Sequence, residues 1–138
     1  MKIQVLKSGE EGLVGYNTIY LNDKYVDLEI VSDNECEEIL LQEDLLSDLS
    51  YEDATNVLVA ISAKLRKSGI MRMVATDLRL VCKEILYGQM SEQDANQLFA
   101  TKNFLISAHE MTTILHHIGL HIETMQLNGL QYEFSATR

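Results

Sequence analysis

Three aspartates follow the two most apolar strand-like runs of the sequence. Asp44 and Asp48 come after the run Cys36 to Gln42, and Asp77 comes shortly after the run Ile70 to Ala75. Ligands of open α/β sheets bind outside the carboxyl ends of the strands, so these acids are candidates for lining a crevice at that edge. The structural alternative is that Asp48 precedes a helix cap and that Asp77 is itself a cap.

All four histidines lie close together in the sequence, at positions 109, 116, 117 and 121. A zinc site needs three or four converging ligands. On one helix His109 and His116 share a face, whereas His117 points about 100° away from His116, and Gly119 separates His121 from the helix. We therefore expect no metal site, and we interpret the histidines as exposed residues near a helix C-terminus, where positive charge is favourable.

The two cysteines, Cys36 and Cys82, lie far apart, one in a predicted strand and one in a predicted helix. They form no Cys-x-x-Cys motif and no framework of paired cysteines. Free cysteine is among the most buried residue types, so we predict two reduced, buried thiols. Neither has a sequence neighbour that would activate it as a nucleophile. The sequence therefore indicates no catalytic residue.

Length and composition predict a single domain over residues 1–138. The chain is 46% hydrophobic and contains no proline, and its length is typical of one domain with its own core. No apolar run approaches the roughly 20 residues of a membrane-spanning helix. The start, Met1 to Gln4, does not resemble a signal peptide. We expect a cytoplasmic protein with no membrane partner.

The formal net charge of −10 is unevenly distributed. No Lys or Arg occurs from Tyr25 to Ala63, while eleven of the 21 acids lie between Asp27 and Asp53. Such a surface repels nucleic acid, so no direct nucleic-acid partner is expected. It is suited to a basic protein partner or to divalent cations, although acidic runs are more often simply solvated faces.

The stretch from Ser50 to Asp77 organises the predicted fold. Ser50 has capping-box-like spacing to Asp53, and apolar residues then recur at helical spacing. We predict that this helix continues through its basic last turn and that Gly69 ends it in a left-handed conformation. A buried strand, Ile70 to Ala75, and another helix follow. This order predicts a sheet covered on both faces.

Three β-prone runs precede this stretch, at residues 2–6, 13–21 and 25–31, and each pair is separated by a turn. We predict that they form a short antiparallel meander within residues 1–34. The next run, 36–42, is predicted to be a buried strand.

Three short helices and a hairpin are predicted after the central strand. Their signals are a cap at Thr76 or Asp77 with Gly88 as the stop, a cap at Ser91, and a Ser107–Glu110 capping box with Gly119 as the stop. Residues 120–127 and 130–137 alternate as strands, and Asn128-Gly129 is a strong hairpin signal.

From Glu35 to the C-terminus, the order of these elements resembles the second half of a class I S-adenosylmethionine-dependent methyltransferase. Residues 45–50 are similar to that family's run after the fourth strand. Residues 65–69 are similar to its turn into the fifth strand, and 74–78 to the end of that strand. Residues 118–120, leading into the hairpin, are similar to the start of its last two strands. The resemblance implies a Rossmann-like α/β fold with parallel strands and a C-terminal antiparallel hairpin.

The sequence departs from this family where the cofactor would bind. Methyltransferases of this class use a glycine-rich loop after strand one and an acid after strand two. Neither residues 7–12 nor 12–15 fit the glycine pattern, and Ser47-Asp48 replaces a Glu-His pair of the family. The resemblance thus implies a shortened, degenerate protein, similar to small proteins of phages and cyanobacteria. In it, the meander 1–34 replaces the cofactor-binding half, 35–138 forms the C-terminal half, and no cofactor is expected.

Three functions remain open at this stage. The favoured one is a non-catalytic methyltransferase-like domain that acts through protein–protein contacts. The second is an active methyltransferase whose S-adenosylmethionine site is atypical or completed by a partner. The third is an acidic inhibitor or mimic that binds a basic protein surface. We also expect a homodimer, with Tyr16, Tyr20 and Tyr25 at its interface, because a half-covered sheet leaves a face and an edge to hide.

Overall fold

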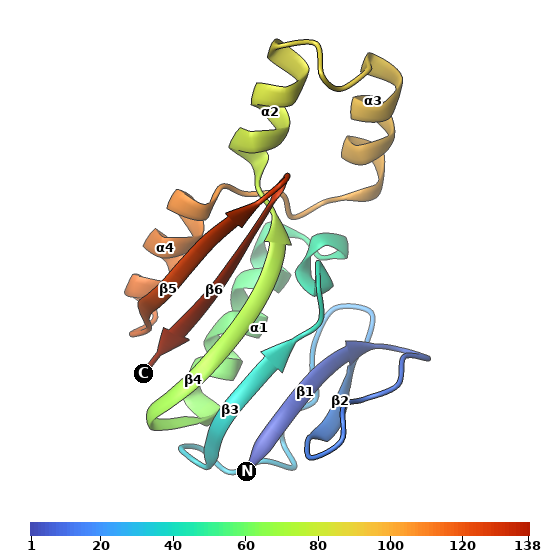
Figure 1. Cartoon of the computed structure of the whole chain (residues 1–138). Coiled ribbons are helices and arrows are strands. Elements are labelled where there is room, and N and C mark those ends of the chain that lie inside the picture. Colours follow the sequence, from blue (N-terminus) through green and yellow to red (C-terminus); the bar gives the residue numbers. More distant parts are fainter.

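The computed structural model describes all residues, 1–138, and contains one six-stranded mixed sheet in the order β2-β1-β3-β4-β6-β5 (Figure 1). The strands are β1 (Lys2–Lys7), β2 (Asn17–Leu21), β3 (Cys36–Leu41), β4 (Leu65–Thr76), β5 (His121–Asn128) and β6 (Gln131–Thr137). The helices are the short 3-10 helix η1 (Leu45–Asp48), α1 (Tyr51–Lys64), α2 (Leu78–Leu86), α3 (Glu92–Thr101) and α4 (Ala108–His117). The predicted fold class, mostly parallel strands with a C-terminal antiparallel hairpin, is confirmed.

Helix α1 begins as predicted. The Ser50 hydroxyl accepts a hydrogen bond from the backbone N–H of Asp53 at 3.1 Å. Leu58 and Ile61 are fully buried against the sheet, together with the rest of the apolar stripe. The helix is therefore held by its cap and by one buried face, which is how most helices in proteins gain stability.

The predicted end of α1 is wrong. The helix stops at Lys64, and β4 already starts at Leu65. Between the pairs Cys36–Leu65 and Glu38–Ile70 the strand bulges outward, and Ser68, not Gly69, takes a positive φ of 63°. Burial of Leu65 in the core favours this early exit over one more helical turn.

Gly69 is needed for a different reason from the one predicted. A Cβ at this position would lie 2.8 Å from the carbonyl oxygen of Cys36 and 2.9 Å from that of Arg66. The bulge is also fastened by Arg138, whose guanidinium donates to the carbonyl oxygen of Leu65 at 2.6 Å. Close backbone approach, rather than a left-handed helix stop, therefore requires glycine here.

The N-terminal meander is also corrected. β1 pairs in parallel with both β2 and β3. The first two runs are therefore strands, but they are parallel and not antiparallel as predicted. The third run, 25–31, forms no strand beyond an isolated bridge between Leu21 and Val26. It places Val26, Leu28 and Val31 in the core instead. Alternation of apolar and polar residues indicates a strand and its two faces but not the strand's direction. Burial of these three side chains favours the observed course of residues 25–31 over a third strand.

The C-terminal part matches the predicted elements. Ser91 and Ser107 cap α3 and α4, and Gly88 and Gly119 have the positive φ expected after a helix. In the hairpin, Asn128 pairs with Gln131, so the two-residue turn is Gly129-Leu130, one position later than predicted. Helices α2 and α3 project beyond the end of the sheet (Figure 1).

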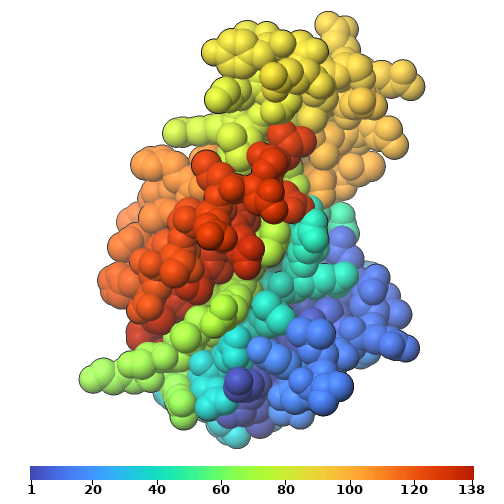
Figure 2. Space-filling model, viewed as in Figure 1, coloured from blue at the N-terminus to red at the C-terminus, as the bar shows by residue number.

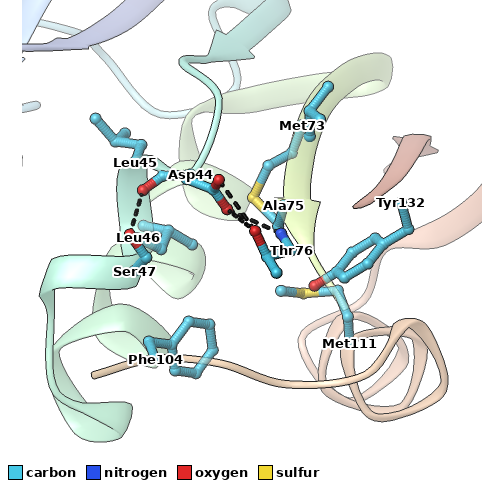
Figure 3. Close-up of a pocket in the computed structure, with 11 residues that line it drawn as sticks. Asp44, Leu45, Leu46, Ser47, Met73, Ala75, Thr76, Phe104, Met111 and Tyr132 are labelled. Carbon is cyan, nitrogen blue, oxygen red and sulfur yellow. Dashed lines mark hydrogen bonds between the residues drawn. The ribbon is translucent and has the colours of Figure 1, made fainter. Parts of the chain in front are cut away.

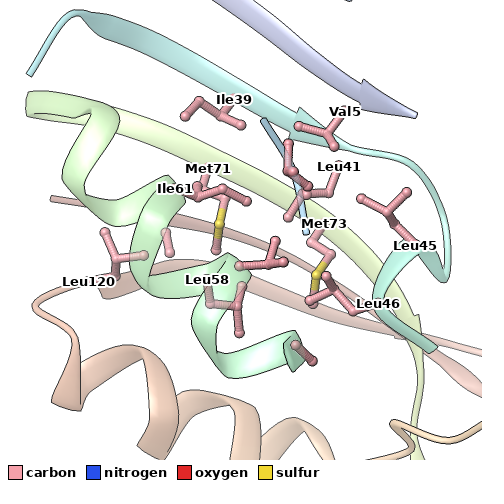
Figure 4. Close-up of a cluster of buried hydrophobic side chains, with 14 of the residues drawn as sticks. Val5, Ile39, Leu41, Leu45, Leu46, Leu58, Ile61, Met71, Met73 and Leu120 are labelled. Atoms are coloured by element: carbon pink, nitrogen blue, oxygen red, sulfur yellow. The ribbon is translucent and has the colours of Figure 1, made fainter. Parts of the chain in front are cut away.

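All the helices that pack on the sheet lie on one face. Helices α1 and α4 lie behind the strands in the view of Figure 1, and Figure 4 shows Leu58 and Ile61 of α1 meeting Met71 and Met73 of β4. On the side facing the viewer no helix covers the strands, and the loop between β1 and β2 covers part of the face (Figure 2). The expectation of a sheet covered on both faces is therefore wrong.

The cysteines divide between core and surface. Cys36 is buried and Cys82 is exposed, so the prediction of two buried thiols holds only for Cys36. Burial raises the pKa of the Cys36 thiol. No helix combines the length and the apolar character required to cross a membrane.

Candidate functional site

The sheet topology places the candidate site at the carboxyl ends of β1 and β3. The chain passes from β1 outward to β2, and from β3 in the opposite direction to β4. In open α/β sheets ligands bind where the connections diverge in this way. Asp44 and Asp48 follow β3 and Asp77 follows β4, so the structure brings all three predicted acids to this end of the sheet.

Asp44 fastens neighbouring elements together. Its carboxylate accepts hydrogen bonds from the backbone N–H of Thr76 at 2.8 Å and from the Thr76 hydroxyl at 3.1 Å. Lys102 lies 3.3 Å from its other oxygen. The residue has a positive φ of 52°, a conformation that Asp adopts more readily than most residues. Asp44 therefore ties the ends of β3 and β4 to the residue after α3.

Asp77 is a cap, as the alternative interpretation of the sequence predicts. Its side chain accepts a hydrogen bond from the N–H of Leu80 at 3.1 Å, and this bond caps α2. The second carboxylate oxygen accepts from the N–H of Ala108 at 2.9 Å, at the start of α4. The residue is buried. One carboxylate thus satisfies the amino ends of two helices and has a structural role.

Asp48 contributes to a link between the carboxyl ends of the neighbouring strands β1 and β3. Its carboxylate lies 3.1 Å from the Lys7 ammonium, at the end of β1. The Gln42 side chain also accepts a hydrogen bond from the Lys7 backbone N–H at 2.7 Å. Sequence reasoning missed Lys7 and Gln42, because their proximity depends on β1 pairing in parallel with β3.

The cavity between the carboxyl ends of β3 and β4 is small. Its lining includes Asp44, Thr76, Phe104, Met111 and Tyr132 (Figure 3). The cavity measures about 10 Å³, which is roughly the space for one water molecule. Burial, followed by the nearby Asp77 and Asp44 carboxylates, raises the pKa of Tyr132, so its phenol stays protonated throughout the physiological range.

The connection from β1 to β2 contains no helix. Residues 8–16 form turns and irregular loop, with positive φ at Gly9 and Gly15. A phosphate or carboxylate is commonly held by the N-terminus of a helix that follows such a loop. Glu10 and Glu11 add negative charge at the same place. The loop therefore leads into no helix N-terminus that could hold an anionic group, and two of its side chains are themselves anionic.

The acid-rich segment, Asp27 to Asp53, is the centre of ion pairing in the chain. All six ion pairs use one of its carboxylates: Lys2–Glu38, Lys7–Asp48, Lys64–Asp33, Arg66–Glu37, Arg72–Glu38 and Lys102–Asp44. Lys64 lowers the pKa of Asp33 by a direct hydrogen bond and by its charge. Five of the eleven acids in this segment are therefore paired with a cation of the same chain.

The histidines come closer together than predicted but form no ligand group. The rings of His116 and His121 are edge to face with centroids 5.2 Å apart, because the chain reverses at Gly119. No three His, Cys, Asp or Glu side chains are placed to hold a metal ion.

The sequence matches no protein-family model and no curated protein. Several solved structures have the same fold. An O-methyltransferase family protein from Burkholderia thailandensis is 12% identical, with a TM-score of 0.64 over 89% of this chain and 36% of that protein. A Thermotoga maritima S-adenosylmethionine-dependent methyltransferase is also 12% identical, with a TM-score of 0.60 over 89% of this chain and 64% of its own.

A third similar structure is a complex between the Haloferax volcanii Trm112 methyltransferase activator and a methyltransferase. It is 8% identical, with a TM-score of 0.62 over 92% of this chain and 63% of that protein. The chain thus spans between about one third and two thirds of the length of these structures. The comparisons establish a methyltransferase-like fold.

Proposed function

We propose that this protein is a non-catalytic methyltransferase-like domain that acts through protein–protein contacts. The observation that carries the proposal is the linked carboxyl ends of β1 and β3, where Lys7 contacts both Gln42 and Asp48. Asp44 and Asp77, the other acids at this edge, already accept hydrogen bonds from the chain itself. No carboxylate of the predicted crevice is left to orient a ligand.

The volumes at this end of the sheet support the proposal as well. An exposed ion pair contributes about 0–1 kcal/mol and a hydrogen bond about 1 kcal/mol, so a ligand could displace either. Pockets for cofactors measure roughly 300–1,000 Å³ and bury most of the ligand. The cavity between the ends of β3 and β4 measures about 10 Å³, and widening it to that size would require moving Met73, Phe104 and Tyr132 out of the core. The hollow beside the ends of β1 and β2, which includes Ser8 and Asp23, measures about 490 Å³ but is open to solvent and does not enclose a ligand.

A protein partner fits this role. The Haloferax volcanii structure with the same fold is a complex with an activator protein, which is a precedent for protein contacts in that system. For the present chain we propose a partner with a basic surface, since the net charge is −10. A homodimer remains a second prediction.

The first alternative is an S-adenosylmethionine-dependent methyltransferase with an atypical or partner-completed cofactor site. The fold favours it, because the similar structures are themselves methyltransferases. Another chain would have to supply the glycine-rich loop and the pocket. The second alternative is an acidic inhibitor or mimic that binds a basic protein surface. Intramolecular pairing of five acids between Asp33 and Asp48 leaves fewer free carboxylates for that role.

Isothermal titration calorimetry with S-adenosylmethionine and S-adenosylhomocysteine tests the proposal. We expect no measurable heat of binding for either ligand. The Thermotoga maritima methyltransferase, titrated under the same conditions, controls for active ligand. One-to-one binding in the micromolar range would contradict the proposal and support the first alternative.

A further inference from the structure

The two edges of the sheet differ in how they are protected. The edge strand β5 carries His121 and Glu123, and its pairing with β6 is interrupted by a bulge between Ile122 and Thr124. Charges and bulges are the usual devices that prevent an edge from pairing with another chain. The opposite edge strand, β2, has no charged residue and pairs with β1 in unbroken register.

Most of the outer side of β2 is open. The bridge between Leu21 and Val26 covers its carboxyl end, and the backbone of residues 17–20 pairs only with β1. Both sheet edges are drawn in Figure 1, with β2 beside β1 at the right. Unpaired N–H and C=O groups on an unprotected edge are a template for another strand.

An apolar groove lies beside the amino end of β2. It measures about 320 Å³ and is lined by five apolar residues from β1, β2 and the loop after β2, together with Asn17 and Thr18: Met1, Ile3, Ile19, Ile30 and Val31. Ile30 is 79% exposed, and of the large apolar side chains only Val14 is more exposed. Segments that add a strand to a sheet gain affinity from backbone hydrogen bonds and specificity from pockets that hold alternate side chains. The groove and the free edge together provide both.

Charge around this edge selects the partner. The loop after β2 carries Asp23, Asp27 and Glu29, none of which forms an ion pair, and Lys24 is its only cation. A second copy would bring three like charges to the same place, and like charges across an interface oppose association. A segment with Lys or Arg beside its apolar residues would be attracted.

We propose that the free edge of β2 is the docking site for an extended segment of a basic protein partner. The segment adds a strand beside Asn17 to Tyr20 and places alternate apolar side chains in the groove next to Ile30. Its Lys or Arg side chains face Asp23, Asp27 and Glu29. This inference rests on the proposed function, because it names the surface and the chemistry of the protein contact.

Peptide display on the intact 138-residue protein tests the inference. A random library of short peptides is panned at physiological salt, and the tightest peptide is measured by fluorescence anisotropy. We expect selected peptides with alternating apolar residues flanked by Lys or Arg. Selection of acidic peptides, of peptides with helical apolar spacing, or of no sequence at all would overturn the inference. Calorimetry with S-adenosylmethionine tests the proposed function separately.

Matched variants locate the binding site. Ile30→Ser and Leu127→Ser both replace an exposed apolar side chain, at the β2 groove and at the β5 edge respectively. We expect Ile30→Ser to weaken the selected peptide on the order of tenfold and Leu127→Ser to leave binding unchanged. The reverse pattern would overturn the inference. Thermal melts of both variants establish that any loss is not caused by unfolding.

A charge variant separates attraction from packing. Asp23→Asn combined with Glu29→Gln should weaken the peptide roughly threefold to tenfold at low salt, and this difference should disappear at high salt. Glu92→Gln combined with Asp94→Asn, on the distant α3, is the matched control and should change nothing. Equal effects of the two pairs of substitutions would overturn the assignment of Asp23 and Glu29 to the binding site. A dimer that Ile30→Ser converts to monomer in light scattering would assign the edge to a second copy and overturn the proposed occupant.

Discussion

Successive residues of each strand point to opposite faces of the sheet, and the two faces differ in polarity. On the covered face, Ile3, Ile39, Met71 and Ala136 form a row across four strands, and each is fully buried. The adjacent row on the other face is Gln4, Leu40, Arg72 and Ser135. Parallel strands are usually buried on both faces and are continuously apolar. Here one face of the four parallel strands carries polar residues and no covering helix, a pattern more common in antiparallel sheets, although Gln4 is buried beneath the loop between β1 and β2.

Polar side chains on the uncovered face satisfy one another. Glu38 pairs with Lys2 at 3.3 Å and with Arg72 at 3.1 Å. The hydrogen bond that the Lys2 ammonium donates to Glu38 is the main cause of the raised pKa of Lys2. The loop between β1 and β2 also crosses this face, where the N–H of Leu13 donates to the Gln4 side chain at 2.7 Å. The face therefore needs no covering helix. An uncovered face was one of the two reasons for predicting a homodimer, and this reason no longer applies.

The covered face should show the largest response to mutation. Leu58→Ala and Ile61→Ala each remove a fully buried side chain that packs between α1 and the sheet. We expect each to lower the free energy of unfolding by about 2–5 kcal/mol, because each leaves a cavity in a close-packed core. Urea denaturation measures the change.

The exposed Glu52 on the same helix is the control for this pair. Glu52→Ala should change the free energy of unfolding by no more than about 0.5 kcal/mol. Similar midpoints for all three variants would mean that the helix presents a different face to the sheet.

Mutations at the carboxyl ends of the strands should lower the free energy of unfolding by less than mutations of the core do. Asp77→Ala removes the cap of α2 and the hydrogen bond to the start of α4, and it leaves two amides at a buried position without their acceptor. We expect a loss of about 1–3 kcal/mol in urea denaturation, since one cap is typically worth about 1 kcal/mol. Ser91→Ala, at the exposed cap of α3, should lose about 0.5–1 kcal/mol. Equal losses would show that the second bond of Asp77 contributes nothing.

Local signals in the sequence predicted the helix starts well. Ser50, Ser91 and Ser107 each accept the hydrogen bond that their spacing to an acid three residues later indicates. Asp77 was recognised both as a candidate ligand and as a cap, and the structure bears out the cap. These features depend only on residues within one helical turn of each other, so the chain nearby contains all the necessary information.

Features that depend on distant parts of the chain were not predictable in the same way. The end of α1 depends on Leu65 entering the core and on Arg138 binding its carbonyl oxygen, and these groups are 73 residues apart. The direction of β2 is linked to the burial of Val26, Leu28 and Val31 in the hydrophobic core. The bridge between Lys7 and Gln42 exists only after β1 has paired with β3. Each of these was missed because alternation and capping carry no information about long-range pairing.

The uncovered face should show the smallest response. Met71 and Arg72 are consecutive on β4 and point to opposite faces, so they form a direct comparison of the two. Met71 is fully buried, whereas the Arg72 side chain is 55% exposed. We expect Met71→Ala to cost about 2–5 kcal/mol and Arg72→Ala about 0–1 kcal/mol in urea denaturation. Glu38 keeps Lys2 as a partner in the Arg72 variant, so no carboxylate is left unpaired, and any loss should shrink further at high salt. A loss from Arg72→Ala as large as that from Met71→Ala, and dependent on protein concentration, would mean that a second chain covers this face in solution. The self-satisfied polar face would then be one half of an interface, and the free edge of β2 would no longer be the first surface to test for a partner.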